Sequence, residues 1–246
     1  MRAFHADGTS LGGANNTECA LDCVSECFAV FAGAEHKEEA FDTLLAGLVD
    51  NENGLVKLLT PAFSGHSGRR IGYIEGYLEG VRENGGQYTH AAAWCVIAAC
   101  MLNRAETAQH LFKLINPIEH GGTLIIERYK GEPYAVAGDV YSEGRLAGRA
   151  GWTQYTGAAG WLYRAATEYI LGIKKHGDRL SITPCTPMDG FTAEYRFGRD
   201  ARTLYRINAK RTGKNAILLD GKENGEDCSI LLADDGNEHD VQVEYR

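Results

Sequence analysis

Two segments of the chain carry residue types that suit an anion. His90 follows the polar stretch 82–88 and stands at the start of an apolar run that reads AAAWCVIAACM. Thr156 and Gly157 stand at the start of a second apolar segment. The first turn of a helix offers unpaired backbone N–H groups and the positive end of the helix dipole, so both segments predict contacts to a phosphate-sized anion. A hydrogen-bonded core histidine and an ordinary helix start remain the alternative interpretations.

The loops around these segments combine aromatic rings with amide, guanidinium and carboxylate groups. Sugars bind through rings that stack on them and through polar groups that reach their hydroxyls. The aromatic candidates are Tyr88, Trp94, Tyr134, Tyr141, Trp152 and Tyr155, and the polar candidates are Arg82, Glu83, Asn84, Gln87, Glu132, Asp139 and Gln154. Aromatic residues within helices more often pack in a core, which favours a packing role for Trp94 and Trp161. The composition alone therefore does not establish a carbohydrate site.

Hydrophobic periodicity predicts the elements that position these residues. A helical period predicts helices over Cys19–Ala34, Lys37–Val49, Tyr88–Leu102, Ala105–Asn116 and Ala158–Ile173. After Gly177 the period changes to two, which predicts strands over Leu180–Thr183, Phe191–Phe197, Thr203–Ala209, Ala216–Leu219, Cys228–Leu232 and Val241–Tyr245. The sequence thus predicts a helical domain over residues 1–177 and a small β domain over residues 178–246.

Bulk composition excludes several classes of function. The 246 residues are 44% hydrophobic and 24% charged, which is typical of a globular protein. A formal net charge of -8 argues against a nucleic-acid partner, because binding to phosphate backbones needs clustered Lys and Arg. The chain has no apolar run long enough to span a membrane, no secretory signal at its start and no P-loop motif.

Seven cysteines are present, and none form a C-x-x-C pair, so a zinc site is not expected. Cys19, Cys23 and Cys27 share one stripe of the first predicted helix. This pattern favours small apolar residues on a buried face over a metal or redox cluster. Free thiols indicate a reducing, cytoplasmic environment. We predict no metal and no cofactor.

Ordered motifs along the chain resemble a known family. They are DGTSLGGANNTECALD from Asp7, RENGGQYTHAAAW from Arg82, INPIEH from Ile115, EPYAVAGDVYS from Glu132, GRAGWTQYTGAAGW from Gly148, YILGI from Tyr169 and LSITPCTP from Leu180. Together they resemble the C-terminal portion of the glycoside hydrolase family 94 phosphorylases. This family includes cellobiose and chitobiose phosphorylases and the C-terminal region of cyclic β-1,2-glucan synthases. The form RENGGQYTHA is most similar to the glucan synthase branch.

The resemblance implies a mainly α fold, a partial (α/α)6 toroid followed by a C-terminal β-sandwich. It implies inverting phosphorolysis of a β-linked gluco-oligosaccharide or disaccharide, with inorganic phosphate as co-substrate. The residues implied for phosphate are His90, Thr156 and Gly157, and those implied for the sugar are Arg82, Glu83, Gln87, Glu132 and Gln154. The implied location is the cytoplasm, or the cytoplasmic face of the inner membrane within a larger glucan synthase.

One feature of the family is missing from this sequence. The general-acid Asp of the family lies in a Trp-Asn-Asp-Gly type motif upstream of the matched segments, and no such motif occurs here. We therefore assign no catalytic residue, and we expect the chain to carry only the phosphate and acceptor-sugar half of a site. The N-terminal half of the same enzyme, or a second copy of the chain, would complete it.

Two other functions remain open at this stage. A small carbohydrate hydrolase or lyase would use Glu83, Glu132 or Asp139 as its acid or base. A non-catalytic module would bind sugar or complete a partner chain. We interpret Asp22 and Asp139 as structural or substrate-contacting residues.

Overall fold

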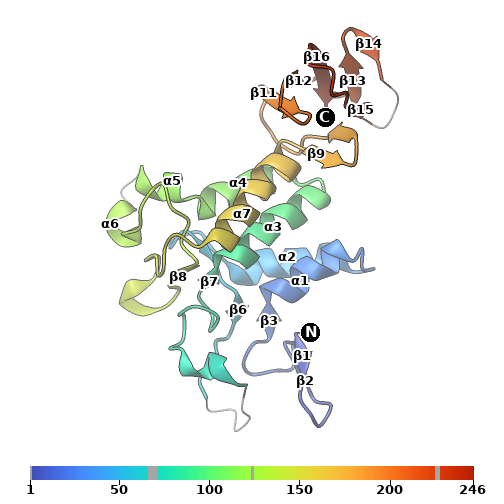
Figure 1. The fold of residues 1–246 in the computed structure, drawn as a ribbon. Helices are drawn as coiled ribbons and strands as arrows, with labels where there is room; N and C mark the ends of the chain where they lie inside the picture. The colour runs from blue at the N-terminus through green and yellow to red at the C-terminus, as the bar shows by residue number, and fades with distance from the viewer. Residues whose placement is uncertain (1, 66–70, 123–124, 225–227) are drawn as a thin grey trace. The chain divides into compact units, whose positions relative to one another are not determined.

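The computed structural model describes residues 2–65, 71–122, 125–224 and 228–246, and α3 (Thr89–Met101) is the most enclosed of its helices. Ten of the 13 residues of α3 are buried, and most of these are alanine or cysteine. Three helices pack against it: α1 (Cys23–Phe31), α4 (Ala105–Ile115) and α7 (Thr156–Arg164) (Figure 1). Small side chains let neighbouring helices approach closely on several faces, which explains why the segment is apolar nearly all round.

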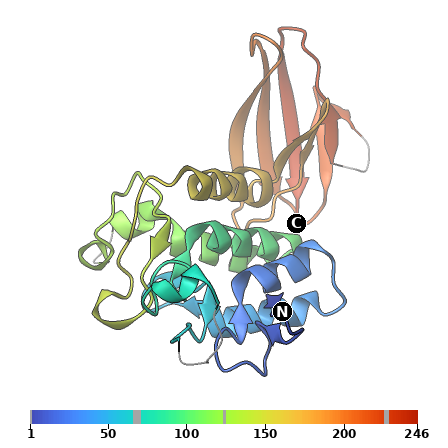
Figure 2. The same ribbon diagram turned by 60° about the horizontal axis from the view of Figure 1, so that its bottom comes forward.

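The five predicted helices are all present. Helix α2 (Lys37–Leu48) forms a hairpin with α1, and α3 and α4 form a second hairpin, as Figure 2 also shows. Helix α7 begins two residues earlier than predicted and continues into a π-helical segment, Ala165–Ile170.

The first helix is shorter than the sequence predicts. Cys19 has a left-handed backbone with φ of 49°, and the next residues form strand β3 (Leu21–Asp22), paired with β6 (Leu59–Thr60). Asp22 then caps α1, since its carboxylate accepts a hydrogen bond of 2.9 Å from the Ser25 N–H. The predicted stripe of three cysteines on one helix is therefore wrong for Cys19, which lies outside α1.

Short elements fill the segments that the sequence leaves irregular. Two short helices, α5 (Pro117–Gly121) and α6 (Ile126–Tyr129), follow α4. Further two-residue strands pair as β1 (Ala3–Phe4) with β2 (Ser10–Leu11), β4 (Val49–Asp50) with β5 (Leu55–Val56), and β7 (Gln87–Tyr88) with β8 (Asp139–Val140). Strands this short have no detectable period in the sequence.

The chain divides by its internal contacts into two units, Met1–Ala165 and Ala166–Arg246. The second unit contains the strands, and the sequence-based division after residue 177 lies inside it. Its larger sheet has the order β11 (Gly190–Phe197), β12 (Thr203–Arg211), β16 (Glu238–Tyr245), β13 (Ala216–Leu219) and β14 (Lys222–Glu223). Its smaller sheet has the order β15 (Ser229–Leu231), β10 (Arg179–Ile182) and β9 (Ile173–His176). The six predicted strands are confirmed, and β9 and β14 are additional.

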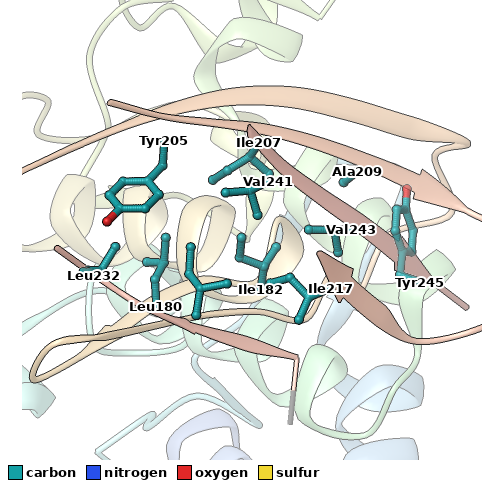
Figure 3. Packing of buried hydrophobic residues seen from close by; sticks show 11 residues of the cluster. Leu180, Ile182, Tyr205, Ile207, Ala209, Ile217, Leu232, Val241, Val243 and Tyr245 are labelled. Atoms are coloured by element: carbon teal, nitrogen blue, oxygen red, sulfur yellow. The ribbon is translucent and has the colours of Figure 1, made fainter. Parts of the chain in front are cut away.

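Side chains from both sheets of the second unit meet in one apolar cluster (Figure 3). Leu180 and Ile182 of β10 pack with residues of β12, β13 and β16. Strands β12 and β16 run parallel, with Ile207 opposite Val241, and both of these side chains are buried. The chain is thus helical first and rich in strands afterwards, as predicted. Among the described residues, none of the helices has the length and apolar character needed to cross a membrane.

A histidine of the second unit connects the ends of two strands. The Nδ1 atom of His239 lies 2.8 Å from Asp220 Oδ2, and its Nε2 atom lies 3.2 Å from Asp235 Oδ2. The ring stacks on Tyr205 at 4.9 Å between centroids. The hydrogen bond to Asp220, aided by Asp235, raises the pKa of His239 above its usual value.

We predict that the second unit is more stable at mildly acidic pH than at alkaline pH. A raised histidine pKa contributes stability that is fully present below the unfolded pKa of about 6.5 and is lost as pH rises through the folded value. Hydrogen–deuterium exchange of β12 and β16, corrected for the intrinsic rate, should show protection falling over that range. In H239Q the fall should disappear, whereas H176Q, at an exposed histidine of β9, should keep it. An unchanged pH dependence in H239Q would contradict this assignment.

Candidate functional site

The polar loop before α3 is held rigid by one buried amide. The side chain of Asn84 is fully buried. Its Oδ1 accepts a hydrogen bond of 2.7 Å from the Phe63 N–H, and its Nδ2 donates to the carbonyls of Phe63 and Tyr77 at 2.9 Å each. Every hydrogen-bonding group of this amide except one lone pair is thereby used. Asn84 is therefore a structural residue that fixes the loop from within.

Glycine is required where this loop turns back on itself. A Cβ atom at Gly86 would lie 2.9 Å from the backbone N and O of Arg82 and 3.0 Å from the carbonyl of Gly80. Gly85 has φ of 86°, and its carbonyl accepts a hydrogen bond of 2.8 Å from the hydroxyl of Ser142. These constraints fix the positions of the two charged side chains that precede the glycines.

Gln87 faces the protein interior. Its Oε1 accepts a hydrogen bond of 2.9 Å from the Val56 N–H, and its Nε2 donates to the Thr89 hydroxyl at 3.1 Å. The side chain is 1% exposed. We therefore assign Gln87 a positioning role at the start of α3 and do not include it among the groups that contact a ligand.

Arg82 and Glu83 form a partly buried pair with incomplete hydrogen bonding. Arg82 Nε lies 3.5 Å from Glu83 Oε2, and among the residues that the structure describes neither of these buried atoms has a hydrogen-bond partner. Arg82 itself has a left-handed backbone with φ of 50°. Burial acts to lower the pKa of Arg82, and Tyr155 and Glu83 more than offset it, so the guanidinium remains charged. Charged groups held out of water without full pairing are unfavourable in the free protein and available to a polar ligand.

Asp139 lies next to this pair and is almost completely enclosed. Its Oδ1 accepts a hydrogen bond of 3.2 Å from the Trp152 N–H. A Cβ atom at Gly151 would lie 2.5 Å from both carboxylate oxygens, so that glycine packs directly on the carboxylate. Burial raises the pKa of Asp139, while Arg82 opposes this shift. Because the Asp139 carboxylate is buried and Gly151 packs against it, its geometry favours a structural role over a role as the acid or base of a hydrolase.

His90 has an unpartnered nitrogen. It lies in the first turn of α3, and its Nε2 atom is buried with no hydrogen-bond partner in the described part of the chain. The ring stacks near Trp161 of α7 at 5.7 Å between centroids and meets Trp94 edge-on at 4.6 Å. Burial lowers the pKa of His90, so the ring is neutral near pH 7. A neutral ring between aromatic walls can donate one directed hydrogen bond to an anion.

The N-terminus of α7 is uncapped. Tyr155, which precedes Thr156, makes no side-chain hydrogen bond to the first turn. Thr156 and Gly157 are exposed, and a Cβ atom at Gly157 would meet nothing within 4 Å. The first turn of this helix therefore has N–H groups without a side-chain cap, next to an exposed hydroxyl and a residue without a side chain.

Gly138 brings the two helix starts together. Its carbonyl accepts a hydrogen bond of 3.0 Å from the Thr89 N–H at the start of α3. A Cβ atom on Gly138 would lie 2.7 Å from the ring of Tyr155, the residue before α7. Contacts between α3 and α7 continue along both helices (Figure 1). His90, Thr156 and Gly157 are thus carried by neighbouring helices, as the anion hypothesis requires.

The two remaining predicted sugar-binding residues, Gln154 and Glu132, differ in their surroundings. Gln154 is exposed, has φ of 63°, and borders a pocket of about 310 Å³. The pocket is lined by Tyr134, Ala135, Val136, Gln154, Tyr155, Thr156 and Ala159. Glu132 lies near Tyr129. Burial, and to a smaller extent the Glu132 carboxylate, raises the pKa of the Tyr129 phenol to about 12. Within the described residues, no hydrogen bond or ion pair joins Glu132 to Arg82 or His90.

Sequence reasoning missed two contributors to this arrangement. Gly138 has no signal beyond its place in the motif EPYAVAGDVYS, because its importance comes from close approach to Tyr155. Trp161 is assigned to packing by its helical position, yet its ring also stacks near the ring of His90. Helical spacing alone does not distinguish these two roles.

Comparison with known proteins identifies the class of the chain. Residues 1–172 match the family described as the glycosyl hydrolase 94 superfamily, catalytic domain. The chain belongs to this superfamily, which confirms the resemblance carried by the sequence motifs.

Individual relatives include both branches of the family. The chain is 46% identical over 220 residues to the cyclic beta-(1,2)-glucan synthase NdvB of Rhizobium meliloti (strain 1021), covering 87% of this chain and 8% of that protein. It is 28% identical over 257 residues to a solabiose phosphorylase of Paenibacillus borealis, covering 99% of this chain and 32% of that protein. It is 30% identical to an N,N'-diacetylchitobiose phosphorylase of Vibrio furnissii, covering 90% of this chain and 28% of that protein. The chain therefore spans a third or less of the length of these relatives.

We predict that the loop before α3 depends on Asn84. Replacing Asn84 by alanine leaves one N–H and two carbonyl groups without their partner, which should lower the free energy of unfolding by about 2 kcal/mol or more. Urea unfolding followed by tryptophan fluorescence measures this, because all three tryptophans lie in the first unit. The control is N51A, at an exposed side chain that contacts His110 at 2.7 Å, and should change stability by less than about 0.5 kcal/mol. Equal effects of the two substitutions would contradict the role of Asn84.

Proposed function

We propose that this chain supplies the phosphate and acceptor-sugar side of an inverting glycoside phosphorylase site. The observation that carries the proposal is that His90, whose Nε2 atom has no partner among the described residues, lies on a helix packed against α7, whose start has no side-chain cap. Membership of a superfamily that includes phosphorylases supports the same function.

The phosphate contacts follow from these two helix starts. His90 Nε2 would donate to one phosphate oxygen, while the Thr156 hydroxyl and the first N–H groups of α7 would bind the others. The helix dipole adds a favourable field for the anion. A neutral histidine also leaves the phosphate free of a fixed ion pair, so the anion keeps its nucleophilic character.

The sugar contacts involve the polar groups around the same helix starts. Arg82 and Glu83 would exchange their imperfect pairing for hydrogen bonds to the hydroxyls of the acceptor sugar. The pocket between Tyr134 and Tyr155 offers aromatic surface, and Gln154 offers an amide at its edge. The substrate class we propose is a β-linked gluco-oligosaccharide or disaccharide.

The reaction needs a proton that this chain does not provide. In inverting phosphorolysis a phosphate oxygen forms a bond to the anomeric carbon as the glycosidic bond breaks. The leaving oxygen takes a proton from a carboxylic acid, so one acid suffices where a hydrolase uses two carboxyl groups. We propose that this acid comes from an N-terminal half of the same enzyme. A second copy of the chain is the alternative source.

We predict that an added methyl group at Gly157 blocks phosphate. Gly157→Ala places a Cβ atom at the first turn, where the anion is proposed to approach the backbone. The loss of about two charge-assisted hydrogen bonds should weaken binding of inorganic phosphate by about tenfold or more, measured by calorimetric titration.

The matched control is Gly160→Ala, one turn further along α7. Gly160 is also exposed, and a Cβ atom there also meets nothing within 4 Å. Both substitutions improve helix propensity, so neither should lower stability. G160A should bind phosphate like the parent chain. If G157A retained the parent affinity, the proposed phosphate site would be rejected.

A further inference from the structure

Three cysteine sulfurs from two helices converge inside the first unit. The Sγ atoms of Cys23, Cys27 and Cys95 all lie within 4.8 Å of one another. Cys95 Sγ lies 3.2 Å from Cys23 Sγ and 3.6 Å from Cys27 Sγ. Cys23 and Cys27 belong to α1 and Cys95 belongs to α3, 68 or more residues away in the sequence.

The cluster is closed to solvent. Cys27 and Cys95 are 0% exposed and Cys23 is 1% exposed. The carbonyl of Ala91 lies 3.5 Å from Cys95 Sγ and 3.7 Å from Cys23 Sγ. Cysteines that serve only as small apolar residues need not direct their sulfurs at one point, whereas these three do so from two helices.

We propose that Cys23, Cys27 and Cys95 form a buried three-sulfur site for a soft, thiophilic metal ion, namely monovalent copper. Thiolate ligands select soft ions, of which Cu(I) is the best match to an all-sulfur donor set. Metal–sulfur bonds of about 2.3 Å place the corners of a trigonal site about 4.0 Å apart. The two observed sulfur–sulfur distances from Cys95, 3.2 Å to Cys23 and 3.6 Å to Cys27, are shorter than this value by about 0.8 Å and a few tenths of an ångström. Small side-chain rotations would move the sulfurs apart by this amount.

The donor set distinguishes copper from zinc. Zinc is four-coordinate in structural sites, and a three-ligand zinc site keeps an open position for water. Among the described residues, the group of metal-ligating side chains here consists of three cysteines, and their burial leaves no route for a water ligand. The Asp22 carboxylate at the start of α1 is engaged by Arg2 and by the Ser25 N–H. Cu(I) is stable with three sulfurs and needs no fourth donor.

Binding exchanges protons for the ion and transfers no electron. Each thiol that becomes a thiolate ligand releases one proton to solvent, so affinity should rise with pH. The bound ion would join α1 to α3, and Ala91 directly follows His90. The site would therefore stabilise the helix start that carries His90, whether or not that residue binds phosphate.

The test loads the full chain with Cu(I) under anaerobic, reducing conditions. Because the sulfurs are closed to solvent, the ion is supplied during refolding from urea, with a competing Cu(I) chelator to set its free concentration. We expect one ion per chain, a raised melting temperature, and an X-ray absorption spectrum with three sulfur neighbours at about 2.3 Å. Zinc supplied in the same way should be lost to its own chelator far more readily.

Variants separate this site from the other cysteines. C95A removes the only sulfur that α3 contributes to the cluster, and it should weaken Cu(I) binding by more than about 100-fold, because loss of even an outer-shell partner commonly costs 10–100-fold. C100A, at a buried cysteine of the same helix, should bind like the parent chain. Should C95A fail to fold, the absorption spectrum of the parent chain still decides. Fewer than three sulfur neighbours, nitrogen or oxygen ligation, no binding at all, or parent-like affinity in C95A would overturn the proposal.

Discussion

The packing of α3 is the constraint on which the rest of the first unit depends. Its alanine and cysteine side chains allow α1, α4 and α7 to pack against it, so it is buried on nearly every face. A helix held on several sides has little freedom to rotate or slide, since interiors are close-packed and transmit strain. The apolar packing of α3 therefore restricts the position of His90 in its first turn.

Polar groups fix the start of α3 in the same way. The Thr89 N–H bonds to the carbonyl of Gly138, and the Thr89 hydroxyl accepts from Gln87. Asn84 holds the preceding turn through three hydrogen bonds. Because the amides of Asn84 and Gln87 are used inside the protein, Arg82 and Glu83 remain as the incompletely paired polar groups of this loop. A rigid frame with a few unsatisfied groups is the usual arrangement of a binding site.

Much of the fold is predictable because long periodic segments carry strong local signals. The helix in the apolar run after His90, the helix over Lys37–Val49 and the alternating strands of the second unit all form as expected. The candidate phosphate residues follow from helix starts, which the sequence marks by a change from polar to apolar residues.

The rest depends on contacts that local patterns do not encode. The left-handed backbone of Cys19 keeps this residue out of α1, which begins only at Cys23, and Cys95 joins Cys23 and Cys27 only through tertiary packing. Gln87 and Gln154 have the same side chain, but one is buried in hydrogen bonds and the other is exposed at a pocket. Burial of a particular amide is decided by the whole fold, so residue type alone does not separate structural from binding glutamines.

The central claim is that His90 and the start of α7 bind one phosphate together. Nuclear magnetic resonance of the chain, with the histidine ring nitrogens and backbone amides observed during titration with inorganic phosphate, tests it most directly. Without phosphate, His90 should be neutral near pH 7 because burial lowers its pKa. Phosphate should raise that pKa and shift the ring signal and the amides of Thr156 and Gly157 along one common binding curve, since a nearby anion favours the charged ring. Unchanged His90 signals, or shifts confined to other residues, would contradict the account.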